Sequence, residues 1–107
     1  MDTTEEQTDC FRAIGDSTRR RVLNLLARRE LTVSDLARRF TISQPAVSQH
    51  LAVLRSAGLV RERKQGRFRY YRADPAGLRP LVTWITEYEK FWRDKLSKLE
   101  SVLDRMK

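Results

Sequence analysis

The sequence predicts a mainly α-helical fold of about five helices with one small β-hairpin after the fourth helix. Three observations support this prediction: capping residues that precede several apolar runs, a basic stretch that alternates around a glycine, and a long apolar stripe near the C-terminus. The 107 residues suffice for one domain but not for two, so we expect a single domain over residues 1–107.

The composition indicates a polyanionic partner. The net charge is +8 and the isoelectric point is near 10.4, while 40% hydrophobic residues allow a modest core. Residues 1–10 sum to −4 and residues 59–72 to +5, so the positive charge is concentrated beyond the N-terminus. Nucleic acid is the first partner that this balance suggests, and an anionic membrane surface is the second.

A cytoplasmic location is expected. Cys10 is the only cysteine, so no disulfide can form within the chain, which is typical of a reducing compartment. The acidic N-terminus lacks the apolar run of a signal peptide, and no stretch approaches the roughly 20 apolar residues of a membrane span.

The first two helices are predicted from an apolar stripe and a cap. Residues 5–14 form the first, with Phe11 and Ile14 on its apolar stripe and Gly15 ending it. Asp16 or Ser17 caps the second. The apolar face of the second helix consists of Val22, Leu23, Leu25 and Leu26.

The next two helices carry clearer start signals. Thr32 with Asp35 three residues later is typical of a capping box, which opens a short helix through Phe40 with Leu36 and Ala37 inward. Ser43 caps the fourth helix, and Pro45 suits its first turn. Val47, Leu51 and Leu54 form its buried stripe, and Gly58 ends it.

The hairpin and the last helix follow. Residues 59–64 and 67–72 flank a turn at Gln65-Gly66, with basic residues largely alternating against Val60, Phe68 and Tyr70. Asp74 and Pro75 cap the last helical region, which Pro80 divides into a short turn and a helix over about 81–105. Its stripe has the spacing of a coiled-coil seam and comprises Leu81, Ile85, Tyr88, Trp92, Leu96, Leu99, Leu103 and Met106.

This order of elements predicts a winged helix-turn-helix that binds double-stranded DNA. Residues 33–57 have the helix-turn-helix layout, and the hairpin over 59–72 is the wing. The outward face at the start of the fourth helix offers side chains that read base edges: Gln44, Ala46, Ser48 and Gln49. Phosphate or wing contacts are expected from Arg19, Ser43, His50, Arg55, Arg61, Arg63, Lys64, Arg67 and Arg69.

Each signal also has a simpler interpretation. The basic strip and the arginines at 19–21 can be solvated surface, as can the polar residues of the reading face. His50 lies near the buried side of its helix, where packing with one hydrogen bond competes with DNA contact and with a pH switch. Cys10 can be a core or interface residue, or it can join two subunits by a disulfide.

The sequence resembles the ArsR/SmtB family of winged helix regulators over nearly its whole length. The resemblance lies in residues 14–23, 30–36, 43–51, 54–60 and the hairpin at 64–71. It implies a homodimer formed by the first and last helices, which represses transcription at inverted-repeat operators. The expected interface, in which the helical spacing itself favours a dimer core over a ligand pocket, comprises Phe11, Leu81, Trp84, Ile85, Tyr88, Trp92, Leu96 and Leu99.

The metal patterns of that family are not matched. Thr32 and Ser34 stand where many relatives have cysteine thiolates, and no histidine follows His50, whereas other relatives bind zinc on the last helix. We therefore expect no metal and no cofactor, as in a metal-independent, autorepressor-like subgroup. An unknown ligand, a redox signal or a protein inducer would then release DNA.

Other classes of function are less well supported. The sequence holds no nucleophile–base set, no glycine-rich phosphate loop and no paired carboxylates in an expected pocket, so an enzyme is not expected. A protein-interaction scaffold built on a winged helix remains the alternative from another class. An RNA-binding module is disfavoured because the fourth helix suits the major groove of B-form DNA.

Overall fold

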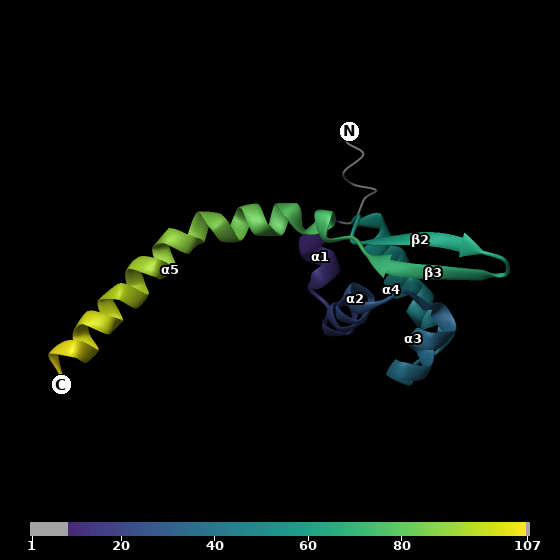
Figure 1. Cartoon of the computed structure of the whole chain (residues 1–107), viewed down its shortest axis with the longest axis horizontal. Helices are drawn as coiled ribbons and strands as arrows, with labels where there is room; N and C mark the ends of the chain where they lie inside the picture. Colours follow the sequence, from purple (N-terminus) through teal and green to yellow (C-terminus); the bar gives the residue numbers. More distant parts are fainter. Residues whose placement is uncertain (1–8, 107) are drawn as a thin grey trace.

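The computed structural model describes residues 9–106, in which one long helix extends from a small helical body (Figure 1). The elements are α1 (Cys10–Ile14), α2 (Ser17–Arg28), β1 (Leu31–Thr32), α3 (Val33–Phe40), α4 (Gln44–Ser56), β2 (Val60–Gln65), β3 (Phe68–Ala73), the 3-10 helix η2 (Pro75–Leu78) and α5 (Arg79–Arg105). The predicted fold class, mainly helical with an antiparallel hairpin, is confirmed.

Helix α1 is shorter than predicted. Asp9 is its N-cap and accepts a hydrogen bond from the Arg12 backbone N–H, so the helix begins at Cys10. Residues 5–8 of the predicted helix lie outside the described residues. Gly15 ends α1 as predicted, but the apolar stripe is shifted: Cys10 and Ala13 are buried, whereas Phe11 is 41% exposed.

The caps of the next three helices agree with the prediction. Asp16 caps α2, and Thr32 with Asp35 forms the capping box of α3. Ser43 caps α4, whose other end is closed by Gly58 at φ +77°. There the Gly58 and Leu59 N–H groups donate to the carbonyls of Arg55 and Leu54, the two bonds of a Schellman motif.

The core lies where α1–α4 meet the base of the hairpin. The predicted stripe of α4 is buried, and Val22 and Leu26 of α2 and Leu36 of α3 pack against it. The remaining buried side chains are Cys10, Ala13, Leu31, Leu59, Val60 and Tyr71.

The hairpin is shifted by one residue from the prediction. Gln65 pairs with Phe68, so the turn residues are Gly66 and Arg67. Gly66 has φ +62° and Arg67 has a negative φ, as expected for a type II′ turn. In this register Tyr71, rather than Phe68 or Tyr70, faces the core: Phe68 is 58% exposed and Tyr70 is half-buried.

A third strand was not predicted. β1 pairs antiparallel with β3, through Leu31 with Tyr71 and Thr32 with Tyr70, and gives the strand order β1-β3-β2. This pairing fixes the hairpin to the start of α3.

Helix α5 leaves the body almost at once. Pro80 lies in its first turn, and the helix begins two residues before the predicted position. Leu81 packs against the core, but every α5 residue from Val82 onward is exposed. The radius of gyration is 18.7 Å, against about 13 Å for a compact chain of this length.

Candidate nucleic-acid interface

The start of α4 presents a polar face to solvent. Val47, Leu51 and Leu54 hold the helix against the core, so Gln44, Ser48 and Gln49 are exposed and Ala46 is half-buried. Pro45 costs no hydrogen bond in the first turn, and the Ser43 hydroxyl accepts from the Ala46 N–H. This hydrogen bond is the N-cap of α4, so Ser43 fixes the residue at which the helix begins.

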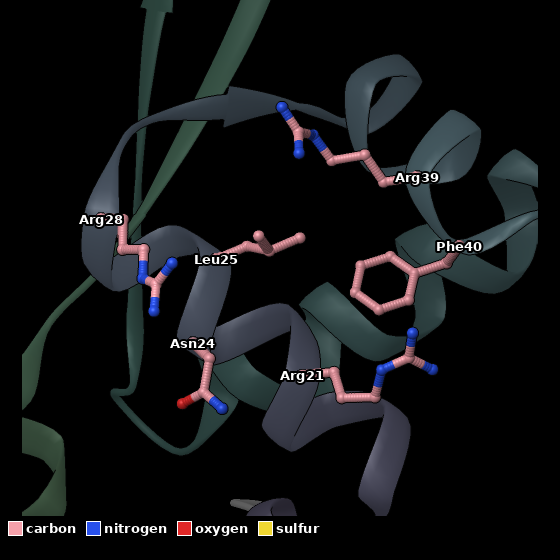
Figure 2. Close-up of a pocket in the computed structure, with 6 residues that line it drawn as sticks. All are labelled: Arg21, Asn24, Leu25, Arg28, Arg39 and Phe40. Atoms are coloured by element: carbon pink, nitrogen blue, oxygen red, sulfur yellow. The ribbon is translucent and has the colours of Figure 1, made fainter.

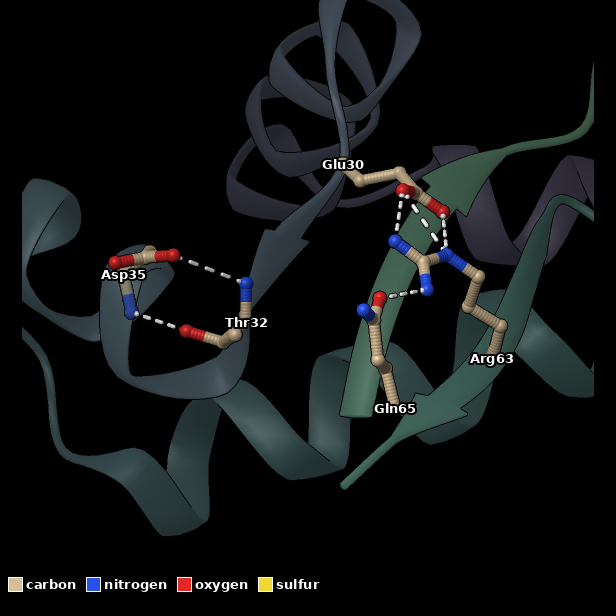
Figure 3. Close-up of polar contacts among 5 residues, drawn as sticks. All are labelled: Glu30, Thr32, Asp35, Arg63 and Gln65. Atoms are coloured by element: carbon tan, nitrogen blue, oxygen red, sulfur yellow. Dashed lines mark hydrogen bonds and ion pairs between the residues drawn. The ribbon is translucent and has the colours of Figure 1, made fainter. Parts of the chain in front are cut away.

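Helix α3 supports the start of α4. Thr41 connects the two helices at φ 56°, and the Gln44 amide donates to the Ser34 hydroxyl at 3.2 Å. The capping box positions Ser34: the Thr32 hydroxyl accepts from the Asp35 N–H, and the Asp35 carboxylate accepts from the Thr32 N–H (Figure 3). The hydrogen bond from the Thr32 backbone N–H is the largest cause of the lowered pKa of Asp35.

The tip of the wing carries unneutralised positive charge. Arg67 is a turn residue beside Gly66, and Lys64 lies one residue before the last strand pair; both side chains are exposed. Within residues 9–106 neither side chain has a carboxylate at ion-pair distance, in contrast to the other predicted wing cations. The tip is therefore the part of the hairpin whose charge is available to an external anion.

Two other wing arginines are bound to carboxylates of the same chain. The Arg63 guanidinium donates to both carboxylate oxygens of Glu30, at 2.9–3.1 Å, and to the Gln65 side chain (Figure 3). Arg61 donates to Asp74 at 2.6 Å. Hydrogen bonds from the arginines are the largest cause of the lowered pKa values of Glu30 and Asp74. Arg61 and Arg63 thus fasten the wing to the body in the free protein.

Glu62 links the wing to the end of α4. Its carboxylate accepts from the Tyr71 hydroxyl at 2.8 Å and lies 3.4 Å from Arg55 and 3.5 Å from Arg69. The Tyr71 hydrogen bond is the main cause that lowers the pKa of Glu62, while burial first and this bond second raise the pKa of Tyr71. Arg55 and Arg69, both expected to contact phosphate, share one internal carboxylate.

The arginines at the start of α2 have a structural role that the sequence interpretation missed. Arg19 donates to the carbonyl oxygens of Ala13 and Arg12, and Arg20 donates to that of Ile14. These carbonyls are at the C-terminal end of α1, where cations are favoured. The same two side chains that oppose the dipole of α2 therefore stabilise α1.

His50 and Cys10 lie away from the exposed reading face. His50 is half-buried. It lies near Asp16, whose pKa is lowered mainly by the hydrogen bond from the Arg19 backbone N–H. Cys10 is 3% exposed within the core, so its thiol is not at the surface where a second subunit could reach it.

The predicted dimer residues, apart from Leu81, lie on an uncovered surface. Phe11 of α1 and Trp84 of α5 meet edge to face, with ring centroids 5.9 Å apart, and Trp84 also contacts Tyr88. Ile85, Trp92, Leu96 and Leu99 continue the stripe, each 51–60% exposed. The stripe goes on through Val102 and Leu103 to the end of the helix.

Among residues 9–106, no three side chains of the types His, Cys, Asp and Glu come together to hold a metal ion. None of the helices in that range combines the length and the apolar character needed to cross a membrane.

Comparisons with known proteins agree on one family. The profile described as "Bacterial regulatory protein, arsR family" matches residues 16–62. The chain is 39% identical to the HTH-type transcriptional regulator Rv2034 of Mycobacterium tuberculosis, over 97% of this chain and 94% of that protein. It is 36% identical to the transcriptional repressor SdpR of Bacillus subtilis, over 73% of this chain and 87% of the relative.

The solved structures agree with the sequence relatives. An ArsR-like transcriptional regulator from Rhodococcus superposes with a TM-score of 0.71 at 32% identity, covering 91% of this chain and 89% of the other.

Proposed function

Because the chain belongs to the arsR family of bacterial regulatory proteins, and is thus a DNA-binding transcriptional repressor rather than an enzyme, we propose that it acts as a homodimer on inverted-repeat operators. The observation that supports this most directly is the exposed polar start of α4, which a hydrogen bond from Gln44 to Ser34 joins to α3. In the proposed complex this end of α4 enters the major groove, with Gln44, Ser48 and Gln49 facing base edges.

The wing binds the sugar-phosphate backbone beside that groove. Lys64 and Arg67 supply free charge at the tip, and Gly66 lets the backbone approach closely. Arg55 and Arg69 lie 3.4 and 3.5 Å from Glu62, and both guanidinium groups are exposed. Each can therefore rotate from Glu62 to a phosphate. Arg61 and Arg63 act indirectly, by holding the wing at a fixed angle to the body.

The homodimer follows from the uncovered stripe of α5. A row of half-exposed aromatic and aliphatic side chains on a projecting helix is unfavourable in water, and a second copy of the same stripe would cover it. Two copies related by a two-fold axis would place two α4 helices on half-sites about one helical turn of DNA apart.

We also propose that release from DNA does not depend on a metal. The side chains that replace the cysteines of metal-sensing relatives have other partners here: Thr32 caps α3, and the Ser34 hydroxyl accepts from Gln44. Both are neutral hydroxyl groups, which are poor ligands for soft metal ions.

The test is selection of bound sequences from random duplexes, followed by affinity measurements on the selected site. We expect an inverted repeat, and Gln49→Ala should reduce the preference for it over random DNA by about tenfold, since a bidentate base contact contributes roughly 1–3 kcal/mol. Arg67→Gln should weaken both kinds of DNA and flatten the salt dependence by about one unit per wing. No sequence preference in the selection would refute the proposal.

A further inference from the structure

A pocket of about 440 Å³ lies between α2 and α3, outside the candidate DNA interface (Figure 2). Its lining consists of Arg21, Asn24, Leu25 and Arg28 from α2 and Arg39 and Phe40 from α3. The volume is in the range that small-molecule sites occupy in proteins, roughly 300–1,000 Å³.

The charge of this pocket is not balanced. Three guanidinium groups line it and no carboxylate does. Several other arginines of the chain are paired with acids, as Arg38 is with Asp35 and Arg63 with Glu30. Within the described residues, none of Arg21, Arg28 and Arg39 forms an ion pair. Like charges gathered around one hollow repel each other, and an anion placed among them would remove that repulsion.

The pocket also has an apolar part. Leu25 and Phe40 lie between the three guanidinium groups in Figure 2, and both side chains are half-buried at the edge of the core. The Arg21 guanidinium stacks on the Phe40 ring, 4.8 Å from its centroid, which holds one cation in place. A bare inorganic anion would leave Leu25 and Phe40 uncovered, whereas a ligand with a flat apolar body would cover them.

We propose that this pocket is an effector site for a small organic anion, namely a carboxylate or phosphate ester attached to an aromatic or similarly flat apolar body. The arginines bind the acid group, and Leu25 with Phe40 receive the apolar body. The effector role rests on the proposed function as a repressor; the binding of the anion does not.

The position of the pocket explains how binding could reach DNA. Arg39 and Phe40 are the last two residues of α3, and Ser43, the N-cap of α4, follows after Thr41 and Ile42. Thr41 has a left-handed backbone at φ 56°, a conformation that a β-branched residue adopts at a cost. A ligand that moves the end of α3 therefore acts on a strained connection that sets the start of α4.

DNA phosphate is the other anion that such arginines could bind. It is less favoured because the pocket is concave and partly apolar, and a phosphodiester would meet the arginines without using Leu25 or Phe40. This alternative is one outcome of the test below.

The experiment titrates phenyl phosphate into the full chain without DNA and measures binding by calorimetry, with inorganic phosphate as the comparison. We expect phenyl phosphate to bind at least about tenfold more tightly, since its ring removes the apolar surface of Leu25 and Phe40 from water. Arg39→Gln should weaken phenyl phosphate binding by about tenfold. Arg29→Gln removes the same charge beside the pocket but not in its lining, so its effect should stay below about twofold.

A second arm adds phenyl phosphate to the protein bound to its selected DNA site, where a drop in DNA affinity of at least about fivefold is expected. The proposed binding site would be refuted if Arg39→Gln and Arg29→Gln bound phenyl phosphate equally well. It would also be refuted if the wild-type chain bound phenyl phosphate and inorganic phosphate equally well. No phenyl phosphate binding together with weaker DNA binding by Arg39→Gln would assign the arginines to DNA and overturn it too. Unchanged DNA affinity would overturn the effector role. A chain that binds phenyl phosphate but no DNA would refute the proposed function and leave the pocket standing.

Discussion

Glu62 is an acidic side chain in the middle of the basic wing, and its surroundings explain why it is there. Its carboxylate is the common partner of Tyr71, Arg55 and Arg69, which belong to β3 and α4. The side chain is only 13% exposed. One carboxylate thus joins the wing to α4 and neutralises two arginines in the free protein.

The first prediction concerns pH. Since the Tyr71 hydrogen bond and the nearby cations hold the pKa of Glu62 below its value in the unfolded chain, the unfolded state takes up the proton first as pH falls. The stabilisation is complete above about pH 5 and is lost progressively below about pH 4.3. Glu62→Gln should reduce this acid-induced loss of unfolding free energy, measured by urea titrations from pH 7 to 3. Glu100→Gln, on exposed α5, is the control, and an equal effect of the two would contradict the assignment.

The same substitution should change DNA binding at neutral pH. Glu62→Gln removes the internal competitor for Arg55 and Arg69, so both become available to phosphates. We expect tighter binding to random duplex DNA and a salt dependence steeper by up to about two units per subunit. Filter binding at salt concentrations from about 50 to about 200 mM, where this dependence is pronounced, measures the slope. Weaker binding with an unchanged slope would show that Glu62 only supports the wing.

At the scale of elements, Gly77 is the point where η2 crosses the end of α4. A Cβ added at Gly77 would lie 2.2 Å from the Gly58 carbonyl oxygen, which belongs to the motif that closes α4. To relieve this contact, η2 would have to move away from Gly58, and α5 would move with it because α5 follows η2 directly. The close approach therefore sets the direction in which α5 leaves the body.

Gly77→Ala should accordingly lower the free energy of unfolding by about 2–3 kcal/mol, because the methyl group meets backbone rather than a flexible side chain. Gly15→Ala is the control: its Cβ would lie 3.3 Å from the Arg12 carbonyl oxygen, a tight contact that a small shift relieves, and its φ is −70°, so the loss should stay below about 1 kcal/mol. Urea unfolding of the two variants measures both values. Equal losses would mean that the approach of η2 to Gly58 is not a constraint.

Elements whose determinants are local were predictable from the sequence. Asp16, Thr32, Ser43 and Gly58 act on backbone groups three to five residues away, so the sequence alone places the ends of the helices. The hairpin was placed correctly but its turn was off by one residue. Gly66 has the freedom to serve at either central position of a two-residue turn, and the strand pattern alone did not decide between them.

Features that depend on residues distant in the sequence could not be predicted from it. The pairing of β1 involves only two residues, too few to produce a pattern. Arg63 and Glu30 are 33 positions apart, so their ion pair cannot be read from spacing, and Arg63 was assigned to DNA. Arg19 and Arg20 bind carbonyls six and seven residues back, across the turn between α1 and α2. The order of elements and the basic residues of the hairpin predicted the candidate interface, but they did not distinguish free arginines from paired ones.

At the scale of the whole molecule, the chain separates its two kinds of surface. The three arginines of the pocket and the exposed cations of the wing tip lie on the body and the hairpin, while most exposed aromatic and aliphatic side chains lie on α5. Helical geometry places Lys90 and Ser97 on the side of α5 opposite Trp92. The projecting helix is thus apolar on one side only, as expected if that side is covered by a second copy and the other remains in water.

The dimer prediction follows from that asymmetry. Trp92 is 60% exposed in the middle of the stripe, so Trp92→Asp would place a charge where two stripes meet without disturbing the core of the body. We expect monomers in sedimentation velocity, together with loss of operator binding of at least about 100-fold, because one subunit then reaches only one half-site. Ser97→Asp introduces the same charge on the opposite side of α5 and should leave dimer and DNA binding unchanged. An unaltered sedimentation coefficient for Trp92→Asp would show that the stripe is not the interface.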